Sequence, residues 1–132
     1  MIFKEPKAIY LQIADRICND IITAYYLEES RIPSVREYAA LVEVNANTVM
    51  RTYEYLQQLG AIYNKRGIGY FVASGAQALL VKKAREAFEM DDLPRLFEDM
   101  QRLDISLEKI AQKYKEFCAN KPQKNKKDES HD

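Results

Sequence analysis

The sequence predicts a mostly α-helical fold that contains one small β-hairpin. Apolar residues recur at three- and four-residue spacing through most of the 132 residues, which is the period of an amphipathic helix. Only residues 61–73 depart from this pattern, with β-branched and aromatic residues on both sides of a glycine-containing tip. After Gly75 the composition changes, and no tyrosine occurs until Tyr114. This change predicts a boundary between two parts of the chain.

Composition places the chain among ordinary globular proteins. The hydrophobic fraction is 47% and the charged fraction 30%, which excludes a disordered, collagen-like or disulfide-dense chain. No apolar run reaches the roughly 18 residues that a membrane span needs. The N-terminus also lacks the apolar core and cleavage site of a signal peptide. We therefore expect a cytoplasmic protein without a membrane partner.

The charge is balanced, with 20 basic and 20 acidic residues. At finer resolution, residues 31–75 carry five cations and three acids, whereas residues 1–30 carry three cations and five acids. The overall neutrality therefore does not argue against a polyanionic partner. It predicts weak non-specific affinity for nucleic acid, which depends on counterion release.

Few residues are suited to catalysis or metal binding. His131 is the single histidine, and Cys18 and Cys118 lie a hundred residues apart, without zinc-site spacing. No Walker-type phosphate loop or complete GxGxxG motif is present. We expect no enzyme, no cofactor and no metal site, and we interpret Cys18 as a buried structural thiol.

Residues 8–26 are predicted to form the first helix. Its apolar stripe consists of Tyr10, Ile13, Ala14, Ile17, Ile21 and Tyr25. A polar link over residues 27–30 follows.

Capping signals predict two further helices, over residues 35–42 and 46–59. Ser34 and the glutamate three residues later match a capping box. Asn45 is a favourable N-cap, and Gly60 suits the left-handed residue that ends a helix. Two such helices joined by a short turn are typical of a helix-turn-helix. The hairpin over residues 61–73, with its tip at 65–69, makes the order that of a winged helix-turn-helix.

The second part is predicted to be helical. Helices are expected over residues 76–89, 93–103 and 107–118. Asp91 and Asp92 are expected to cap the middle one, with Pro94 in its first turn. The predicted domains are a winged helix-turn-helix DNA-binding domain over residues 1–75, a helical dimerisation region over residues 76–119 and a disordered tail over residues 120–132.

The start of the third predicted helix carries side chains that suit the reading of DNA bases. These are Asn45, Asn47, Thr48 and Arg51. A recognition helix reads base edges through its N-terminal residues, where asparagine pairs with adenine and arginine with guanine. The alternative is a solvated helix face with a polar cap, which is the commoner role for Asn45 alone.

Two other places carry candidate phosphate ligands. Arg36 lies in the first turn of the second helix, beside free amides that attract anions, and the Ser34 hydroxyl either caps that helix or donates to phosphate. Lys65 and Arg66 lie at the hairpin tip, where Gly67 permits close approach to a sugar-phosphate chain. The alternatives are an ion pair for Arg36 and ordinary turn chemistry for the tip.

Several runs of sequence carry a resemblance. They are Arg31–Glu37, Val44–Val49, Leu59–Ile62 and Arg66–Val72. In order and spacing they resemble the GntR family of bacterial transcription regulators, over about residues 8–73. The resemblance implies DNA contacts at Arg36, Asn45, Asn47, Thr48, Arg66 and Gly67. Glu43 stands where the family commonly has glycine, Ala46 where YtrA-like members often have proline, and the glycine usual before the first run is absent.

The short helical part that follows Gly75 resembles that of the YtrA-like subfamily, whose members use it to dimerise. The apolar residues expected at the interface are Leu80, Ala84, Ala87, Phe88, Leu96, Phe97, Met100, Ile110 and Tyr114. A two-fold dimer implies a palindromic operator. The resemblance implies a transcription regulator, most simply a repressor. The alternatives are stripes that pack on the same chain and a winged-helix module that binds protein instead of DNA. We expect no well-formed small-molecule site in the monomer.

Overall fold

The computed structural model describes residues 7–121 and divides into two compact units. The first ends at Glu86 and the second begins at Ala87. No helix of the described residues is long and apolar enough to cross a bilayer.

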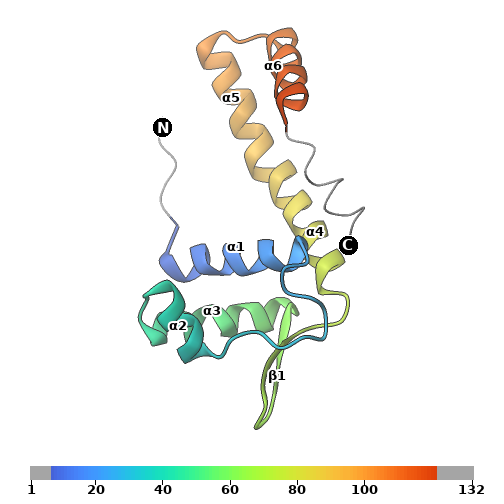
Figure 1. The fold of residues 1–132 in the computed structure, drawn as a ribbon. Helices are drawn as coiled ribbons and strands as arrows, with labels where there is room; N and C mark the ends of the chain where they lie inside the picture. The colour runs from blue at the N-terminus through green and yellow to red at the C-terminus, as the bar shows by residue number, and fades with distance from the viewer. Residues whose placement is uncertain (1–6, 122–132) are drawn as a thin grey trace. The chain divides into compact units, whose positions relative to one another are not determined.

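The first unit is a winged helix-turn-helix (Figure 1). Its elements are α1 (Ile9–Ile22), α2 (Val35–Val42), α3 (Ala46–Leu59), β1 (Ile62–Lys65), β2 (Gly69–Val72) and the start of α4 (Ala76–Ala87). Helix α1 lies across α3, and the buried Thr52 hydroxyl donates to the Tyr10 carbonyl at 2.7 Å. The predicted class, mostly helical with a small β-wing, is confirmed.

The core of the first unit lies between α1, α3 and the hairpin. Its largest fully buried side chain is Tyr53, whose hydroxyl donates to the Pro33 carbonyl at 2.6 Å and so satisfies its polar end. The core members are Ile13, Ala14, Ile17, Ile21, Ile32, Tyr38, Ala39, Val49, Tyr53, Leu56, Ala61, Ile62, Val72, Ala76 and Leu80.

The capping predictions for α2 and α3 are confirmed. The Ser34 hydroxyl accepts from the Glu37 amide at 3.1 Å, and the Glu37 carboxylate accepts from the Ser34 amide at 2.8 Å. The Asn45 side chain accepts from the Asn47 amide at 2.7 Å. Gly60 ends α3 with φ of 86°.

The predicted end of the first helix is wrong. Helix α1 ends at Ile22 rather than residue 26, because Ala24 takes a left-handed conformation with φ of 67° that no helix can continue. The Thr23 hydroxyl donates to the Asn19 carbonyl at 2.9 Å, and this bond adds to the one that the Thr23 amide makes to the same carbonyl. Tyr25, expected in the apolar stripe, is therefore 74% exposed.

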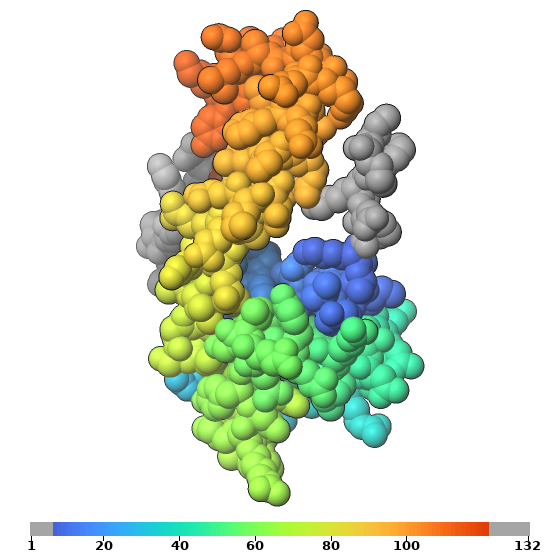
Figure 2. Space-filling model, turned by 180° about the vertical axis from the view of Figure 1, so that it is seen from behind, coloured from blue at the N-terminus to red at the C-terminus, as the bar shows by residue number. Residues whose placement is uncertain are grey.

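The hairpin carries a third strand segment that the sequence pattern did not indicate. β1 and β2 pair in antiparallel register, with Tyr63 opposite Phe71 and Lys65 opposite Gly69. On the other edge of β2, Arg31 forms an antiparallel bridge with Phe71. The chain between α1 and α2 therefore becomes part of the wing. Figure 2 shows the hairpin, in light green, projecting from the body of the first unit.

Helix α4 begins inside the first unit. The Glu28 carboxylate accepts from the amides of Gly75 and Gln77 at 2.9 and 3.1 Å, and the Gln77 side chain donates to the Ile22 carbonyl at 2.7 Å. Leu80 is consequently 4% exposed and belongs to this core. Its prediction as a dimer-interface residue is corrected, and the first unit extends past the boundary expected at residue 75.

The second unit is helical throughout its described residues. It contains a π-helical turn η1 (Phe88–Asp92), α5 (Leu93–Leu103) and α6 (Leu107–Asn120). Left-handed Asp104, with φ of 58°, ends α5, and Ser106 caps α6 by accepting from the Lys109 amide at 3.1 Å. The tail predicted to be disordered begins at residue 120, but Asn120 is the last residue of α6. Residues 122–132 lie outside the described residues.

The predicted cap at Asp91 and Asp92 is wrong. Asp92 has helical φ and ψ of −75° and −42° and makes no capping bond, so the chain passes from η1 into α5 without a break. Pro94, which has no N–H to donate, follows this wide turn, and its ring would crowd the preceding turn of a regular α-helix. The π-turn makes room for the ring while the helix continues.

Candidate nucleic-acid interface

The N-terminus of α2 presents one exposed cation beside a satisfied cap. The backbone amide of Ser34 donates to the Glu37 carboxylate and lowers the pKa of that group. The Ser34 oxygen accepts in its own capping bond, so the hydroxyl hydrogen remains suited to donation to a phosphate oxygen. Arg36 is exposed on the first turn of α2. This end of the helix can hold an anion through a side chain as well as through backbone amides.

The first turn of α3 presents a small polar surface. Asn45 and Asn47 are exposed, and Thr48 is half-buried beside them. Only the Asn45 side-chain oxygen is used in capping, so its amide group retains two donors for a base edge or a phosphate. The two amide side chains and the hydroxyl can therefore reach a DNA groove together.

Arg51 is exposed one turn further along α3, and its guanidinium group packs on a neighbouring helix. The guanidinium carbon of Arg51 lies 4.0 Å from the centre of the Tyr10 ring on α1. Tyr55 contacts the same ring edge-on, with ring centres 6.3 Å apart. Arg51 therefore stabilises the packing of α3 against α1 in the free protein.

The tip of the wing carries the remaining predicted residues. Lys65, Arg66 and Gly67 are exposed, and Gly67 has φ of 80°, which explains the need for glycine there. The Ile68 amide donates to the Lys65 carbonyl at 2.8 Å and closes the turn. The Ile68 side chain is 56% exposed, an apolar group at the tip that the sequence reasoning did not single out.

The cations of this surface are not neutralised by ion pairs. None of the ion pairs found within residues 7–121 involves Arg36, Lys65 or Arg66. Glu43 is the unfavourable neighbour, since it ends α2 in an exposed, left-handed conformation just before α3. The three cations are therefore available to a polyanion, whereas Glu43 opposes it.

Arg31 is a residue that sequence reasoning missed. It opens the run that contains Pro33 and Ser34, but the sequence pattern predicts no role for it. Its exposed side chain alternates with that of Ile32, which is 2% exposed, as expected for a half-buried strand. A single such alternation is too short to predict a strand from sequence.

The second unit presents apolar side chains without a core of its own. No residue of 87–121 is buried. The large exposed side chains are Phe88, Met90, Leu96, Phe97, Leu103, Leu107, Tyr114 and Phe117. Met100 and Ile110 are half-buried and Ala87 is exposed, as is Ala84 near the end of the first unit.

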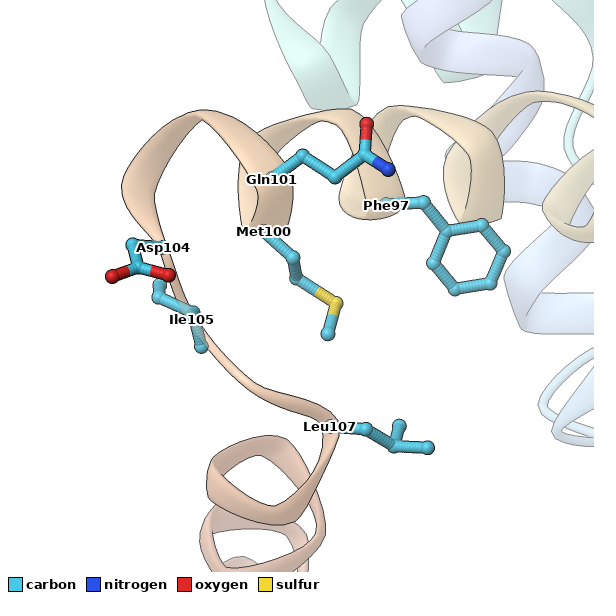
Figure 3. Close-up of a pocket in the computed structure, with 6 residues that line it drawn as sticks. All are labelled: Phe97, Met100, Gln101, Asp104, Ile105 and Leu107. Atoms are coloured by element: carbon cyan, nitrogen blue, oxygen red, sulfur yellow. The ribbon is translucent and has the colours of Figure 1, made fainter.

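One hollow of about 520 Å³ lies within the second unit, between the end of α5 and the start of α6. Figure 3 shows Phe97, Met100 and Leu107 directed toward it from the two helices. Its lining is mostly apolar, with Gln101 and Asp104 at the margin. In the part of the chain that the structure describes, no group of three potential metal ligands occurs.

Known proteins resemble this chain closely. The family model described as bacterial regulatory proteins of the gntR family matches residues 9–72. A solved structure of a putative transcriptional regulator of the GntR family from Bacteroides thetaiotaomicron is 55% identical, covers 85% of this chain and 97% of that one, and has a TM-score of 0.70.

Two curated relatives come from Bacillus subtilis. The HTH-type transcriptional regulator YhcF is 34% identical over 115 residues, which cover 87% of this chain and 93% of the relative. The HTH-type transcriptional repressor YtrA is 29% identical over 123 residues, which cover 91% and 94%.

The winged helix-turn-helix and its exposed polar surface define a DNA-binding transcription regulator, not an enzyme. The chain belongs to the GntR family, and its similarity to YtrA over nearly its whole length places it among the YtrA-like members.

Proposed function

We propose that this protein represses transcription by binding a palindromic operator as a homodimer. The observation that carries the proposal is the combination of an exposed polar start of α3 with unpaired cations at α2 and at the wing. These three places are the ones that a winged helix uses to read and grip a duplex.

Each predicted DNA ligand receives a role from its chemistry. Asn45, Asn47 and Thr48 read base edges in the major groove, since amide side chains discriminate adenine. Arg36, with the Ser34 hydroxyl beside it, binds a backbone phosphate at the N-terminus of α2. Lys65 and Arg66 contact the adjacent backbone, and Gly67 lets the tip approach it. Arg51 supports the position of α3.

The second unit supplies the dimer contact. Its exposed apolar side chains on α5 and α6, Phe97 and Leu107 among them, gain burial when a second copy covers them. A two-fold dimer presents two copies of α3 to half-sites about 34 Å apart or a multiple of that spacing. The operator is then palindromic.

Repression is supported by the related B. subtilis protein YtrA, a transcriptional repressor. A repressor needs only to occupy the operator. We expect it to act in the cytoplasm, where bacterial DNA is found. A reporter gene behind a selected binding site should therefore fall in expression when the protein is present. A rise would identify an activator.

The DNA-binding part is tested with duplexes selected from a random library by the wild-type protein. We expect a symmetric motif, a steep loss of affinity with salt, and weaker binding by Arg36→Ala and Arg66→Ala. If selection yields no enriched sequence and neither variant weakens binding, the protein is an interaction module that has lost DNA binding.

The dimer is tested by sedimentation of the full chain at tens of micromolar concentration. We expect twice the 15.4 kDa of one chain for the wild type and a monomer for Phe97→Glu. Leu27→Glu, which changes an exposed apolar residue of the first unit, is the matched control and should stay dimeric. A wild-type monomer would overturn this part of the proposal.

A further inference from the structure

We propose that Arg31 and Lys65 together form a phosphate-binding site on the outer face of the wing, in addition to the contacts at its tip. The proposal rests on DNA binding by the first unit and concerns one backbone phosphate of the bound duplex. It adds a residue, Arg31, that lies outside both the helix-turn-helix and the hairpin.

Sheet geometry places the two cations on the same face. Arg31 bridges to Phe71 on one edge of β2, and Tyr63 lies opposite Phe71 on the other edge. The side chains of paired residues lie on one face of a sheet, as do those two positions further along a strand. Lys65 and Gly69 therefore share this face with Arg31 and Phe71.

Gly69 provides the space that the Arg31 guanidinium occupies. A Cβ atom at Gly69 would lie 2.7 Å from the Arg31 Nε atom, which is closer than side-chain atoms pack. The guanidinium thus extends over the bare backbone of β2 toward the tip. Lys65 pairs with Gly69 across the hairpin, so the backbone of Lys65 lies beside the position that the Arg31 guanidinium covers.

Aromatic packing holds Lys65 in place. Its ammonium nitrogen lies 4.6 Å from the centre of the Phe71 ring, and the Tyr63 ring stacks on Phe71 at 5.8 Å between centres. Ordering a lysine or arginine side chain costs conformational entropy. Part of that cost is already met in the free protein.

Two acids lie near this face, but each accepts a hydrogen bond from another group of the protein, and neither forms an ion pair with Arg31 or Lys65 within residues 7–121. The Glu29 carboxylate accepts from the Tyr63 hydroxyl at 2.8 Å, and the Glu37 carboxylate, which acts electrostatically on Arg31, caps Ser34. Two unpaired cations beside exposed backbone are suited to a phosphate diester, which offers paired oxygens to a guanidinium.

The test measures affinity for a selected duplex at several salt concentrations, with Arg31→Gln and Arg31→Lys. We expect Arg31→Gln to bind about tenfold more weakly near 0.1 M salt and to lower the slope of log K against log salt by about one per contacted phosphate. Arg31→Lys should retain the slope. Arg16→Gln, which removes a cation from α1, is the matched control and should change neither quantity.

A neutral methylphosphonate scanned through the duplex locates the contact. At the phosphate held by Arg31, the substitution should weaken the wild type and leave Arg31→Gln unchanged. A purely structural role would lower the melting temperature of Arg31→Gln without altering the salt slope.

The outcomes separate this proposal from the proposed function. If Arg31→Gln keeps wild-type affinity and slope while Arg36→Ala and Arg66→Ala weaken binding, the Arg31 site is overturned and DNA binding stands. If none of the three variants changes binding, the proposed function itself fails.

Discussion

Arg51 and Tyr10 form a cation–π contact that ties α3 to α1, with the guanidinium carbon 4.0 Å from the ring centre. Arg51 had been expected to contact DNA because it follows the polar start of the recognition helix by one turn. Its position over Tyr10 gives it a role in the framework that orients α3.

This contact predicts the behaviour of Arg51→Met. At exposed sites a cation–π pair contributes about 0.5 to 1 kcal/mol, so the free energy of unfolding should fall by that amount. A double-mutant cycle with Tyr10→Leu, followed by urea unfolding, should show coupling of the same size. Additive effects of the two substitutions would show that the Arg51–Tyr10 contact contributes no stability. If Arg51→Met also loses as much DNA affinity as Arg36→Ala, Arg51 is a DNA contact.

Glu43→Gly should improve both stability and DNA binding. Glu43 has φ of 57°, and a non-glycine residue in this left-handed region costs roughly 1 kcal/mol or more. Glycine removes that strain and also removes a negative charge beside α3. Urea unfolding and binding to a selected duplex measure the two effects.

Glu43→Gln separates the two causes, since it keeps the side chain and removes only the charge. We expect it to raise DNA affinity without the gain in stability. If Glu43→Gly is no more stable than Glu43→Gln, the left-handed conformation of Glu43 costs less than about 1 kcal/mol.

Stability should depend on pH through Glu28. Hydrogen bonds from the amides of Gly75 and Gln77 lower the pKa of the Glu28 carboxyl. A lowered folded-state pKa gives stability that is present above the unfolded pKa of about 4.3 and is lost as the pH falls through the folded pKa.

The corresponding measurement compares urea midpoints of the wild type and Glu28→Gln from neutral pH to about pH 3. The wild type should be more stable at neutral pH, and the difference should shrink in acid. Glu54→Gln, at an exposed position on α3, is the control. A difference that stays constant with pH would mean that the charged form of Glu28 is not what binds the two amides.

Cys18 should resist alkylation in the folded protein. Cys18, predicted to be buried, is half-buried against the core of the first unit. This partial burial raises the pKa of its thiol to about 11, so little thiolate exists at about pH 8. In Cys118→Ser, where Cys18 is the one remaining thiol, mass spectrometry after iodoacetamide treatment should show unmodified protein. The same treatment in concentrated urea should add one label, and rapid labelling without urea would contradict the burial.

Local signals in the sequence predicted much of the first unit. Ser34, Asn45 and Gly60 each fix a helix end through a bond or a conformation that lies within a few residues, so their types alone identify the boundary. The end of α1 was missed because Ala24 adopts a left-handed conformation that its residue type does not predict.

Other features depended on residues far apart in the sequence. The burial of Leu80 follows from the docking of α4 by Glu28, and the wing strand of Arg31 follows from its bridge to Phe71. The unbroken helix from η1 through Asp92 into α5 was missed because an aspartate shortly before a proline is a common helix start. A π-turn has no sequence signal of that strength. The polar ligands at α2, α3 and the tip are exposed as the sequence suggests, and their DNA contacts stay predictions.

The Glu28 cap of α4 also bears on the order of folding. Its bonds to Gly75 and Gln77 join residues 47 and 49 positions apart, so the loop between them closes only after the intervening helices and hairpin have formed. Such late contacts are weak in the folding transition state, so removing one accelerates unfolding and leaves the folding rate nearly unchanged. We therefore expect the first turn of α4 to join the first unit late in folding and to leave it early in unfolding.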